Sequence, residues 1–179
     1  MRNFIIGCHY FFLNSVLNKV PFYLFRNFFY KYIFRLKMKD RVTIQSNVRM
    51  LMPSNICIGD NSVVNNRVLL DGRGARLLIG SSVDIASEVN IWTTQHIPGD
   101  EKHSVTSKPV IIEDNVWLCN RVIVLPGSII RKGVVVAAGA VVSGELESGY
   151  IYGGVPAKKL KKLDSSKKHS INSYFPWFM

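Results

Sequence analysis

The sequence has little that would cross-link the chain or carry it across a membrane. Its three cysteines, Cys8, Cys57 and Cys119, are odd in number and widely spaced. They show neither a disulfide framework nor a zinc-ligand spacing, and we expect small, largely buried thiols in a reducing cytosol. The uncharged run from Asn3 to Asn18 is short for a spanning helix and lacks a small-residue cleavage site. This argues against a transmembrane segment or a signal peptide.

Acidic residues are scarce at both ends of the 179-residue chain, which carries a formal net charge of +11. Residues 1–57 hold nine Lys and Arg against one acid, and residues 158–179 hold six against one. Residues 58–157 hold eight against ten. The nearly neutral middle argues against nucleic acid as a partner, because phosphate contacts need cations along the binding face. The basic ends permit an anionic small ligand or an acidic membrane surface near either end.

The first 39 residues are aromatic and basic. They contain twelve Phe and Tyr, with Arg26, Lys31 and Arg35 interleaved. Pro21 suits the first turn of a helix that runs to about Met38. The apolar residues surround this helix instead of forming one stripe, which favours a helical cap, or burial between subunits, over a membrane-surface helix. The cap and a membrane contact are compatible with each other.

From Ile58 onward an aliphatic residue recurs every sixth position. The three series are Ile58, Val64 and Leu70; Ile79, Ile85 and Ile91; and Ile112, Leu118, Val124, Ile130, Val136 and Val142. A small or β-branched residue usually follows four positions later, and Gly, Asp, Asn and Ser cluster between. Neither a helix nor a hairpin meander gives a fixed period of six. Each hexad is therefore predicted to be a short strand plus a corner, stacked in parallel on the turn before it.

Three hexads close one triangular turn of the predicted coil, with the aliphatic residue pointing inward and Gly or Asn at the tight corners. Residues 92–109 break the period and are predicted to loop out of the prism, because they cannot keep the stacking distance. His96 lies near the start of this loop.

Five motifs resemble those of the hexapeptide-repeat acyltransferases, in particular the branch of galactoside, maltose and polysaccharide O-acetyltransferases. They are Val89–His96, Val110–Trp117, Leu125–Gly127, Ala137–Val142 and Gly153–Lys158. The resemblance covers about residues 56–162. It implies an all-β fold, a left-handed parallel β-helix. We expect an aromatic and basic helical cap over residues 1–40, the β-helix over 41–157 and a basic tail over 158–179.

The resemblance implies transfer of an acetyl group from acetyl-CoA to a carbohydrate hydroxyl, with His96 as general base and no metal. A hydroxyl needs a base to take its proton as it attacks, and histidine has a suitable pKa. Polysaccharide-modifying relatives commonly place an acid after this histidine, whereas here Ile97 follows. The group that orients the imidazole is therefore left open. The acids near it in sequence are Asp84, Glu88, Asp100 and Glu101.

The resemblance also places acceptor and donor contacts. Trp117 is expected to cover an acceptor sugar, with an outward packing residue as the alternative. Asn66 matches an acceptor-contacting asparagine less securely than it fits a structural corner. The positions expected to hold acetyl-CoA are Asn120, Ala138, Ser143, Lys158 and Lys161. The two lysines begin the basic tail and suit the nucleotide phosphates, although a lysine-rich end is commonly just solvated.

The family packs three prisms side by side, so we expect a homotrimer with a cleft at each interface. We expect a cytoplasmic protein, with possible contact of residues 1–39 with the inner face of the membrane. The alternative functions are N-acetyl transfer to an amino-sugar nucleotide, transfer to serine, and a non-catalytic membrane-associated scaffold. A zinc carbonic anhydrase on the same coil is set aside, because the coil has no histidine outside residues 92–109.

Overall fold

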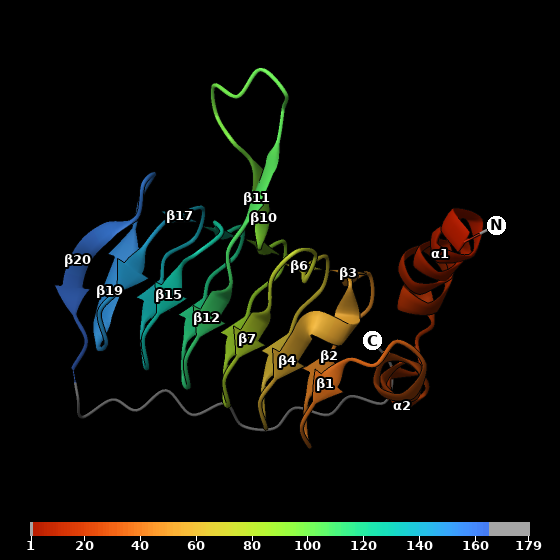
Figure 1. Ribbon diagram of the computed structural model, residues 1–179. Helices are drawn as coiled ribbons and strands as arrows, with labels where there is room; N and C mark the ends of the chain where they lie inside the picture. The colour runs from red at the N-terminus through yellow and green to blue at the C-terminus, as the bar shows by residue number, and fades with distance from the viewer. Residues whose placement is uncertain (1, 165–179) are drawn as a thin grey trace.

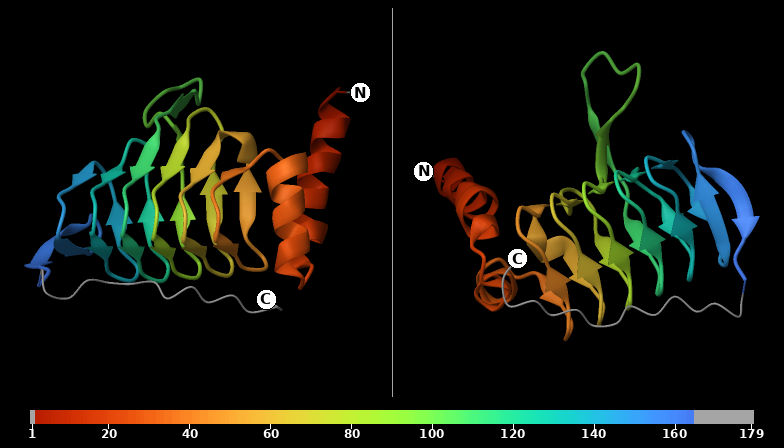
Figure 2. Two further views of the ribbon diagram at one scale, coloured as in Figure 1. Left: turned by 90° about the horizontal axis from the view of Figure 1, so that it is seen from below. Right: turned by 180° about the vertical axis from the view of Figure 1, so that it is seen from behind.

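A computed structural model describes residues 2–164. The chain begins with helices, continues as a coil of short strands and ends the described part in an antiparallel pair of strands (Figure 1). Figure 2 shows the turns of the coil stacked side by side, with the helices at one end. Of the predicted basic tail, residues 165–179 lie outside the described residues, as does residue 1.

The strands of the coil form three sheets, which are the three faces of a prism. Sheet 1 contains β1 (Lys37–Met38), β4 (Ile56–Ile58), β7 (Leu77–Ile79), β12 (Val110–Ile112), β15 (Ile129–Ile130) and β18 (Glu145–Leu146). Sheet 2 contains β2 (Thr43–Ile44), β5 (Val63–Val64), β8 (Asp84–Ile85), β13 (Trp117–Leu118), β16 (Val135–Val136), β19 (Tyr150–Gly153) and β20 (Lys158–Lys162). Sheet 3 contains β3 (Arg49–Leu51), β6 (Leu69–Asp71), β9 (Asn90–Ile91), β14 (Ile123–Val124) and β17 (Val141–Val142).

Each turn passes from sheet 1 to sheet 2 to sheet 3, and its strands pair in parallel with those of the next turn. Only β20 differs among the coil strands of residues 2–164, since it pairs antiparallel with β19. This is the left-handed parallel β-helix that was predicted.

The aliphatic residue of each six-residue step points into the prism, as predicted. All twelve residues of the three series are at most 4% exposed. Nine of the twelve are followed four positions later by a small or β-branched residue that is buried too. Burying one such side chain stabilises a protein by about 1.5–3 kcal/mol relative to leaving it exposed. The aliphatic column is therefore the core of the fold.

Close backbone approach explains the glycines at the corner between sheets 1 and 2. A Cβ atom on Gly59 would lie 2.5 Å from the main-chain carbon of Gly80 in the next turn. Two positions later the backbone is left-handed, with φ of 58° at both Asn61 and Asn115. Glycine and asparagine thus serve the tight corners as predicted, although Ser82 adopts the same conformation with φ of 55°.

Helical segments make up most of residues 2–33 and close the first turn of the coil. They are α1 (Arg2–Phe11), the π-helix Phe12–Val16, the 3-10 turn Leu17–Lys19, α2 (Tyr23–Phe28) and the π-helix Phe29–Ile33. Pro21 lies just before the N-cap Phe22 instead of in the first helical turn. Leu13, Leu17 and Tyr30 join the hydrophobic core of the coil. Within the described residues, none of these helices is both long and apolar enough to cross a bilayer.

The second helix ends earlier than the sequence suggested. It was expected to reach about Met38, but it stops at Ile33, and Lys37–Met38 already pairs with β4. The reason lies in the repeat, because Met38, Ile44 and Met50 continue the six-residue step ahead of Ile58. The coil therefore begins four residues before the expected boundary at residue 41.

A buried arginine ties the cap to the mouth of the coil. Arg26 is 0% exposed, and its guanidinium donates to the carbonyl oxygens of Ile44, at 2.8 Å, and of Val20. Burial lowers the pKa of Arg26 and raises the pKa of the neighbouring Tyr30 to about 12. The carbonyls satisfy a charge that would be costly to bury alone.

Candidate active site

The predicted interruption of the repeat leaves the prism as a two-stranded hairpin. Its strands, β10 (Thr94–His96) and β11 (Val105–Ser107), pair antiparallel, and the hairpin stands away from the coil (Figure 1). It lies at the corner between sheets 3 and 1, which we call the third corner. The two preceding turns also carry extra residues there, at 52–55 and 72–76. The chain thus concentrates its irregular backbone along one edge of a rigid scaffold, as is common for binding loops.

A main-chain carbonyl of its own loop orients His96. Its Nδ1 lies 2.8 Å from the carbonyl oxygen of His103, and the two ring centroids are 4.2 Å apart. Because a carbonyl oxygen only accepts hydrogen bonds, we assign the proton of the neutral ring to Nδ1. Nε2 then keeps its lone pair, which is the form that a general base needs.

The imidazole uses none of the four carboxylates that the sequence offered, within residues 2–164. Asp84 accepts a hydrogen bond from the Asn65 amide at 3.1 Å, and Glu88 pairs with Arg121 at 2.7 Å. Glu101 is exposed near the tip of the loop. A main-chain carbonyl thus orients the imidazole, a role that a carboxylate has in many catalytic triads and metal sites.

Asp100 shapes the turn that presents this carbonyl. Its carboxylate accepts the main-chain N–H of Ser104 at 2.8 Å and that of Lys102 at 3.2 Å. Hydrogen bonds lower the pKa of Asp100, first that of the Ser104 side chain and then those of the two main-chain amides. Since the folded-state pKa is lowered, the stabilisation is present above the unfolded-state pKa and is lost as pH falls through the folded-state value. The Asp100 carboxylate thus holds the amides on either side of His103, whose carbonyl oxygen lies beside His96.

His96 lines a groove of about 320 Å³ along one face of the hairpin. Alternate residues of a strand point to the same side, and the register pairs Thr94 with Ser107 and His96 with Val105. These four side chains line the groove together with Gln95 and the Arg73–Gly74 segment of the preceding turn. Its size lies within the usual range of small-molecule sites, roughly 300–1,000 Å³.

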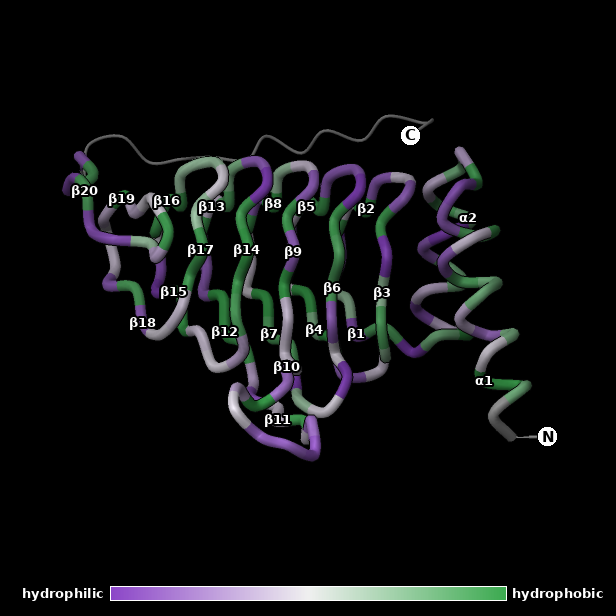
Figure 3. Tube along the Cα trace, turned by 90° about the horizontal axis from the view of Figure 1, so that it is seen from above, coloured by the Kyte–Doolittle hydropathy of each residue, from purple (hydrophilic) through white to green (hydrophobic). Residues whose placement is uncertain are grey.

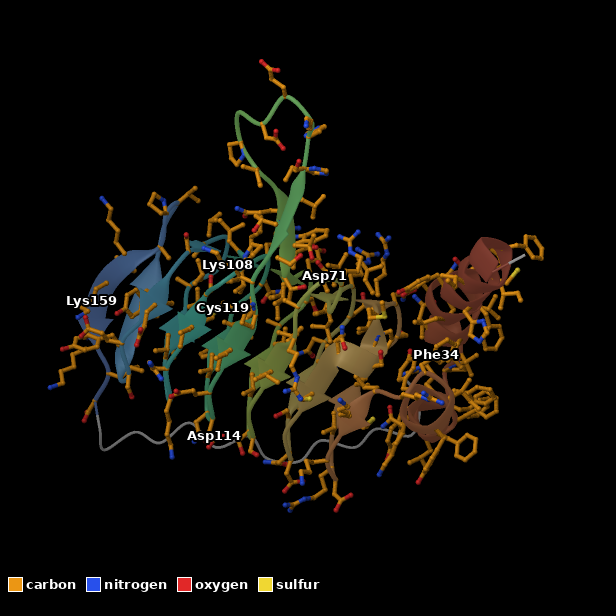
Figure 4. All side chains as sticks on the ribbon, in the orientation of Figure 1. Phe34, Asp71, Lys108, Asp114, Cys119 and Lys159 are labelled. Carbon is orange, nitrogen blue, oxygen red and sulfur yellow. The ribbon has the colours of Figure 1, made fainter. Side chains whose placement is uncertain are left out.

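Asp71 lies at the foot of the hairpin, where Figure 4 labels it, and the sequence analysis missed it. Its side chain is 0% exposed. Oδ1 accepts from the main-chain N of Arg73 at 2.9 Å and from its Nε at 3.0 Å, and Oδ2 accepts from the main-chain N of Thr93 at 3.3 Å. A signal was present, because Leu70 and Ile79 are nine residues apart instead of six. This smaller insertion falls on the same corner as the large one.

Gly74 allows the smaller insertion to lie against the hairpin. Its backbone is left-handed with φ of 64°, and a Cβ atom there would lie 2.1 Å from the Ser107 hydroxyl oxygen. The Thr94 hydroxyl donates to the Arg73 carbonyl at 3.3 Å and lies 3.0 Å from the Ser107 hydroxyl. The two insertions are therefore packed as one unit. Figure 3 shows that much of this unit is hydrophilic.

Three of the other predicted residues share a different edge of the prism. Asn66, Asn120 and Ala138 lie in separate turns at the corner between sheets 2 and 3, and Asn120 and Ala138 are exposed. Asn66 donates its amide to the carbonyl of Ser46 at 2.9 Å. That bond between turns is typical of a structural corner, the alternative that the sequence left open.

The remaining predicted residues lie on sheet 2 or at the third corner, two turns beyond the hairpin. Trp117, on β13, is 37% exposed on sheet 2, the face opposite the third corner in a three-sided prism. Lys158 and Lys161 are exposed on β20. Ser143 follows β17 at the third corner, two turns beyond β9. Within one chain, His96 and Trp117 therefore lie on opposite sides of the prism.

Metal-ligating groups do not gather in the described part of the chain. Among residues 2–164, no three His, Cys, Asp or Glu side chains are placed to hold a metal ion. The three cysteines are free thiols.

Comparison with known proteins shows which family and which relatives the repeat resembles. Residues 109–144 match the family model described as bacterial transferase hexapeptide (six repeats). An Escherichia coli K12 protein named as a lipopolysaccharide biosynthesis O-acetyl transferase is 38% identical over 127 residues, which cover 63% of each chain. Galactoside O-acetyltransferase of the same organism is 31% identical over 120 residues, which cover 65% of this chain and 58% of that one. The chain thus spans about three fifths of these curated relatives.

The fold is shared with a solved structure over most of the chain. A hexapeptide-repeat containing acetyltransferase from Vibrio cholerae, complexed with acetyl coenzyme A, matches with a TM-score of 0.77 at 27% identity. The match covers 86% of this chain and 84% of that one. The likeness therefore extends well beyond the residues that the family model matches.

The role of Asp100 can be tested on the histidine itself. Asp100→Ala removes the acceptor for two main-chain amides, so the His103 carbonyl is expected to leave the Nδ1 atom of His96. In ¹⁵N NMR spectra, neutral His96 should change from mainly Nδ1-protonated to a mixture of tautomers. Glu101→Ala, the adjacent exposed acid, is the control and should leave the spectrum unchanged. A wild-type spectrum dominated by Nε2 protonation would contradict the assignment.

Proposed function

Because residues 109–144 match the bacterial transferase hexapeptide family model, we propose that the chain is a hexapeptide-repeat acyltransferase that transfers the acetyl group of acetyl-CoA to a hydroxyl group of a carbohydrate. The observation that carries the proposal is the imidazole of His96, fixed by a carbonyl on Nδ1 and open at Nε2 beside a groove. The names of the relatives support it, since those proteins are O-acetyltransferases of a galactoside and of lipopolysaccharide biosynthesis.

The proposed reaction is direct transfer in a ternary complex. Nε2 of His96 takes the proton of the acceptor hydroxyl as its oxygen attacks the thioester carbonyl. The carbon–sulfur bond breaks as the tetrahedral intermediate collapses, and the imidazolium returns the proton to the sulfur of coenzyme A. The hydrogen bond from Nδ1–H to the His103 carbonyl holds the ring in place and stabilises its charged form between the two steps. No metal takes part.

The donor is proposed to lie along the prism. Asn120 and Ala138 are exposed at one corner, where small or short side chains allow a pantetheine arm to approach the backbone. Lys158 and Lys161 are exposed on β20 and suit the nucleotide phosphates, and Ser143 is proposed as a further donor contact at the third corner. Lys159, between them, is held by Glu147 at 2.7 Å and lies over the ring of Tyr150.

The active unit is proposed to be a trimer in which neighbouring chains share each site. His96 lies at the third corner, whereas Asn120, Ala138 and Trp117 lie at another corner or on the opposite face. One side of the prism is about six residues of nearly extended chain, so the two corners are up to about 20 Å apart in one chain. A protruding hairpin that reaches over a neighbouring prism would join the two halves. Trp117 is then proposed to meet the acceptor from the neighbouring chain, whereas Asn66 keeps its structural role at the corner.

An amine on an amino-sugar nucleotide is the alternative acceptor, and a non-catalytic scaffold is the alternative function. A hydroxyl is favoured because the curated relatives carry the name of O-acetyltransferases. An enzyme is favoured over a scaffold because the hydrogen bond at Nδ1 selects one tautomer of His96. A scaffold has no need of that selection.

Residues 1–39 are proposed to touch an anionic membrane surface. Twelve large apolar side chains between Phe4 and Ile33 are 40–75% exposed. The same segment exposes Lys19, Lys31 and Arg35, and it contains no acid. Apolar side chains with interleaved cations fit the boundary between lipid tails and acidic headgroups.

His96→Ala tests the proposed chemistry. The variant removes the base, so acetyl transfer should fall by about two orders of magnitude or more while coenzyme A binding and thermal stability are kept. The measurement is release of coenzyme A with a panel of sugars, sugar nucleotides and lipid-linked oligosaccharides. His9→Ala, an exposed histidine of the cap, is the matched control and should keep its rate. An undiminished rate for His96→Ala would exclude the base role.

Mixed oligomers test the shared site. His96→Ala lacks the base, and Ala138→Trp blocks the proposed donor groove, so each variant alone should be inactive. Refolding the two together at equal amounts should restore about a quarter of the wild-type activity, because one interface in four pairs an intact histidine with an intact groove. A site confined to one chain would restore none.

Vesicle flotation tests the membrane contact. The protein should float with vesicles of mixed neutral and anionic phospholipid and stay behind with neutral vesicles, and added salt should weaken the binding. Phe25→Ser with Phe28→Ser should reduce binding about tenfold or more, because two aromatic side chains no longer enter the interface. Leu160→Ser, which removes an exposed leucine on β20, should leave binding unchanged. Equal binding of the double variant and the wild type would rule out this surface.

A further inference from the structure

The insertion at residues 72–76 places a charged group in the same groove as His96. From its geometry we infer that the groove binds an acceptor with an anionic group, a carboxylate or a phosphate, and that Arg73 is the residue that holds this group. The inference rests on the proposed acetyl transfer and specifies its acceptor. A charged sugar would then be preferred over a neutral one.

Arg73 is held in position before any ligand arrives. Its main-chain N and its Nε both donate to Oδ1 of Asp71, at 2.9 and 3.0 Å. Asp71 is 0% exposed, so its charge is balanced by the Arg73 guanidinium and by the amide of Thr93. Removing a partner from a buried charge is costly, which keeps the arginine in this orientation.

The outer end of the guanidinium remains available. Within residues 2–164, the two Nη nitrogens of Arg73 donate to no protein acceptor, and the side chain is 48% exposed. A guanidinium held through Nε presents its two Nη groups together, which matches the two oxygens of a carboxylate or phosphate. Arg73 is thus a preformed cradle for an oxyanion.

The position of the cradle relative to His96 is fixed by the hairpin. Thr94 bonds the Arg73 carbonyl, and His96 is the next residue of β10 on the same face. Two residues of a strand span about 7 Å, so His96 and the point where the Arg73 main chain contacts the hairpin are separated by about that distance along it. The groove between them has a volume of about 320 Å³.

The charges around the groove agree with an anionic ligand. Of the seven residues that line it, Arg73 is the one with a permanent charge, and none is acidic. The residues proposed to hold the phosphates of coenzyme A, Lys158 and Lys161, lie on β20 of sheet 2 and do not line this groove. The oxyanion at Arg73 is therefore assigned to the acceptor and not to the phosphates of coenzyme A.

The test compares matched acceptors. Wild-type protein is assayed with a methyl hexoside, the corresponding methyl hexuronide and the hexose 1-phosphate. The wild type should prefer a charged acceptor in kcat/KM. Arg73→Gln should lose roughly 10- to 100-fold of kcat/KM on the charged acceptors, through KM, and less than threefold on the neutral one. The KM for acetyl-CoA should stay constant.

Two further variants test whether the effect of Arg73→Gln comes from losing the guanidinium at this position. Arg76→Gln removes the same charge from the same loop but does not line the groove, and it should keep the preference for charged acceptors. Asp71→Asn combined with Arg73→Gln avoids leaving a buried carboxylate without its partner, and it should show the same loss of preference. If this double variant kept the wild-type preference, Arg73 would not be the cradle.

A binding measurement separates this inference from the proposed function. Methyl hexuronide titrated into wild-type protein should shift the NMR signals of the Arg73 Nε–H group and the His96 ring, and Arg73→Gln should abolish the shifts, whether or not turnover is seen. Turnover of neutral and charged sugars at equal efficiency, without these shifts, would overturn the inference and leave the proposed function standing. A rise in KM for acetyl-CoA alone would assign Arg73 to the donor and overturn it as well. Binding without transfer to any acceptor would support the cradle and overturn the function.

Discussion

Burial of one aliphatic side chain in every six is the interaction on which the rest of this structure depends. Val124 and Val142 stack on Ile91 in successive turns and are removed from water, and the backbone hydrogen bonds run between turns. A turn is therefore held mainly by its neighbours, and residues added at a corner need not disturb the sheets. This is why the chain can interrupt the repeat with the 18-residue loop 92–109 and resume the same register at Ile112.

The rigid prism gives an irregular loop a fixed base, and this loop carries His96, the proposed general base. The hairpin rises from strands whose side chains are locked in the core, so few soft degrees of freedom separate the prism from His96. The turn at Asp100 then closes the loop onto the imidazole through the carbonyl of His103. A main-chain acceptor can replace a carboxylate here because it has a fixed direction and adds no charge that would need its own partner.

The sequence predicted the parts of the structure that repeat and missed those that occur once. The six-residue step identified the buried ladder and the protruding loop, since periodicity reports on burial directly. The partner of His96 could not be found this way, because it depends on a backbone with φ of 53° at His103 and not on a side chain. Asp71 was missed because an acid after Leu70 resembles a solvated corner unless the nine-residue step to Ile79 is noticed. The early end of the second helix was missed for a similar reason, since Met38 and Met50 are less typical of the ladder than Ile or Val.

The two insertions at the third corner form one packed unit, because the carboxylate of Asp71 bonds to residues of both. A buried carboxylate needs several donors, and here they come from Arg73 on one insertion and Thr93 at the root of the other. Because a loss of either donor leaves the charge less compensated, the position of the arginine and the root of the hairpin are energetically coupled. Gly74 adds a steric link, since any side chain there would push the small loop away from Ser107. The groove beside His96 therefore has a shape and a charge set by contacts below it, which explains how two irregular segments at one corner can present a defined surface to a ligand.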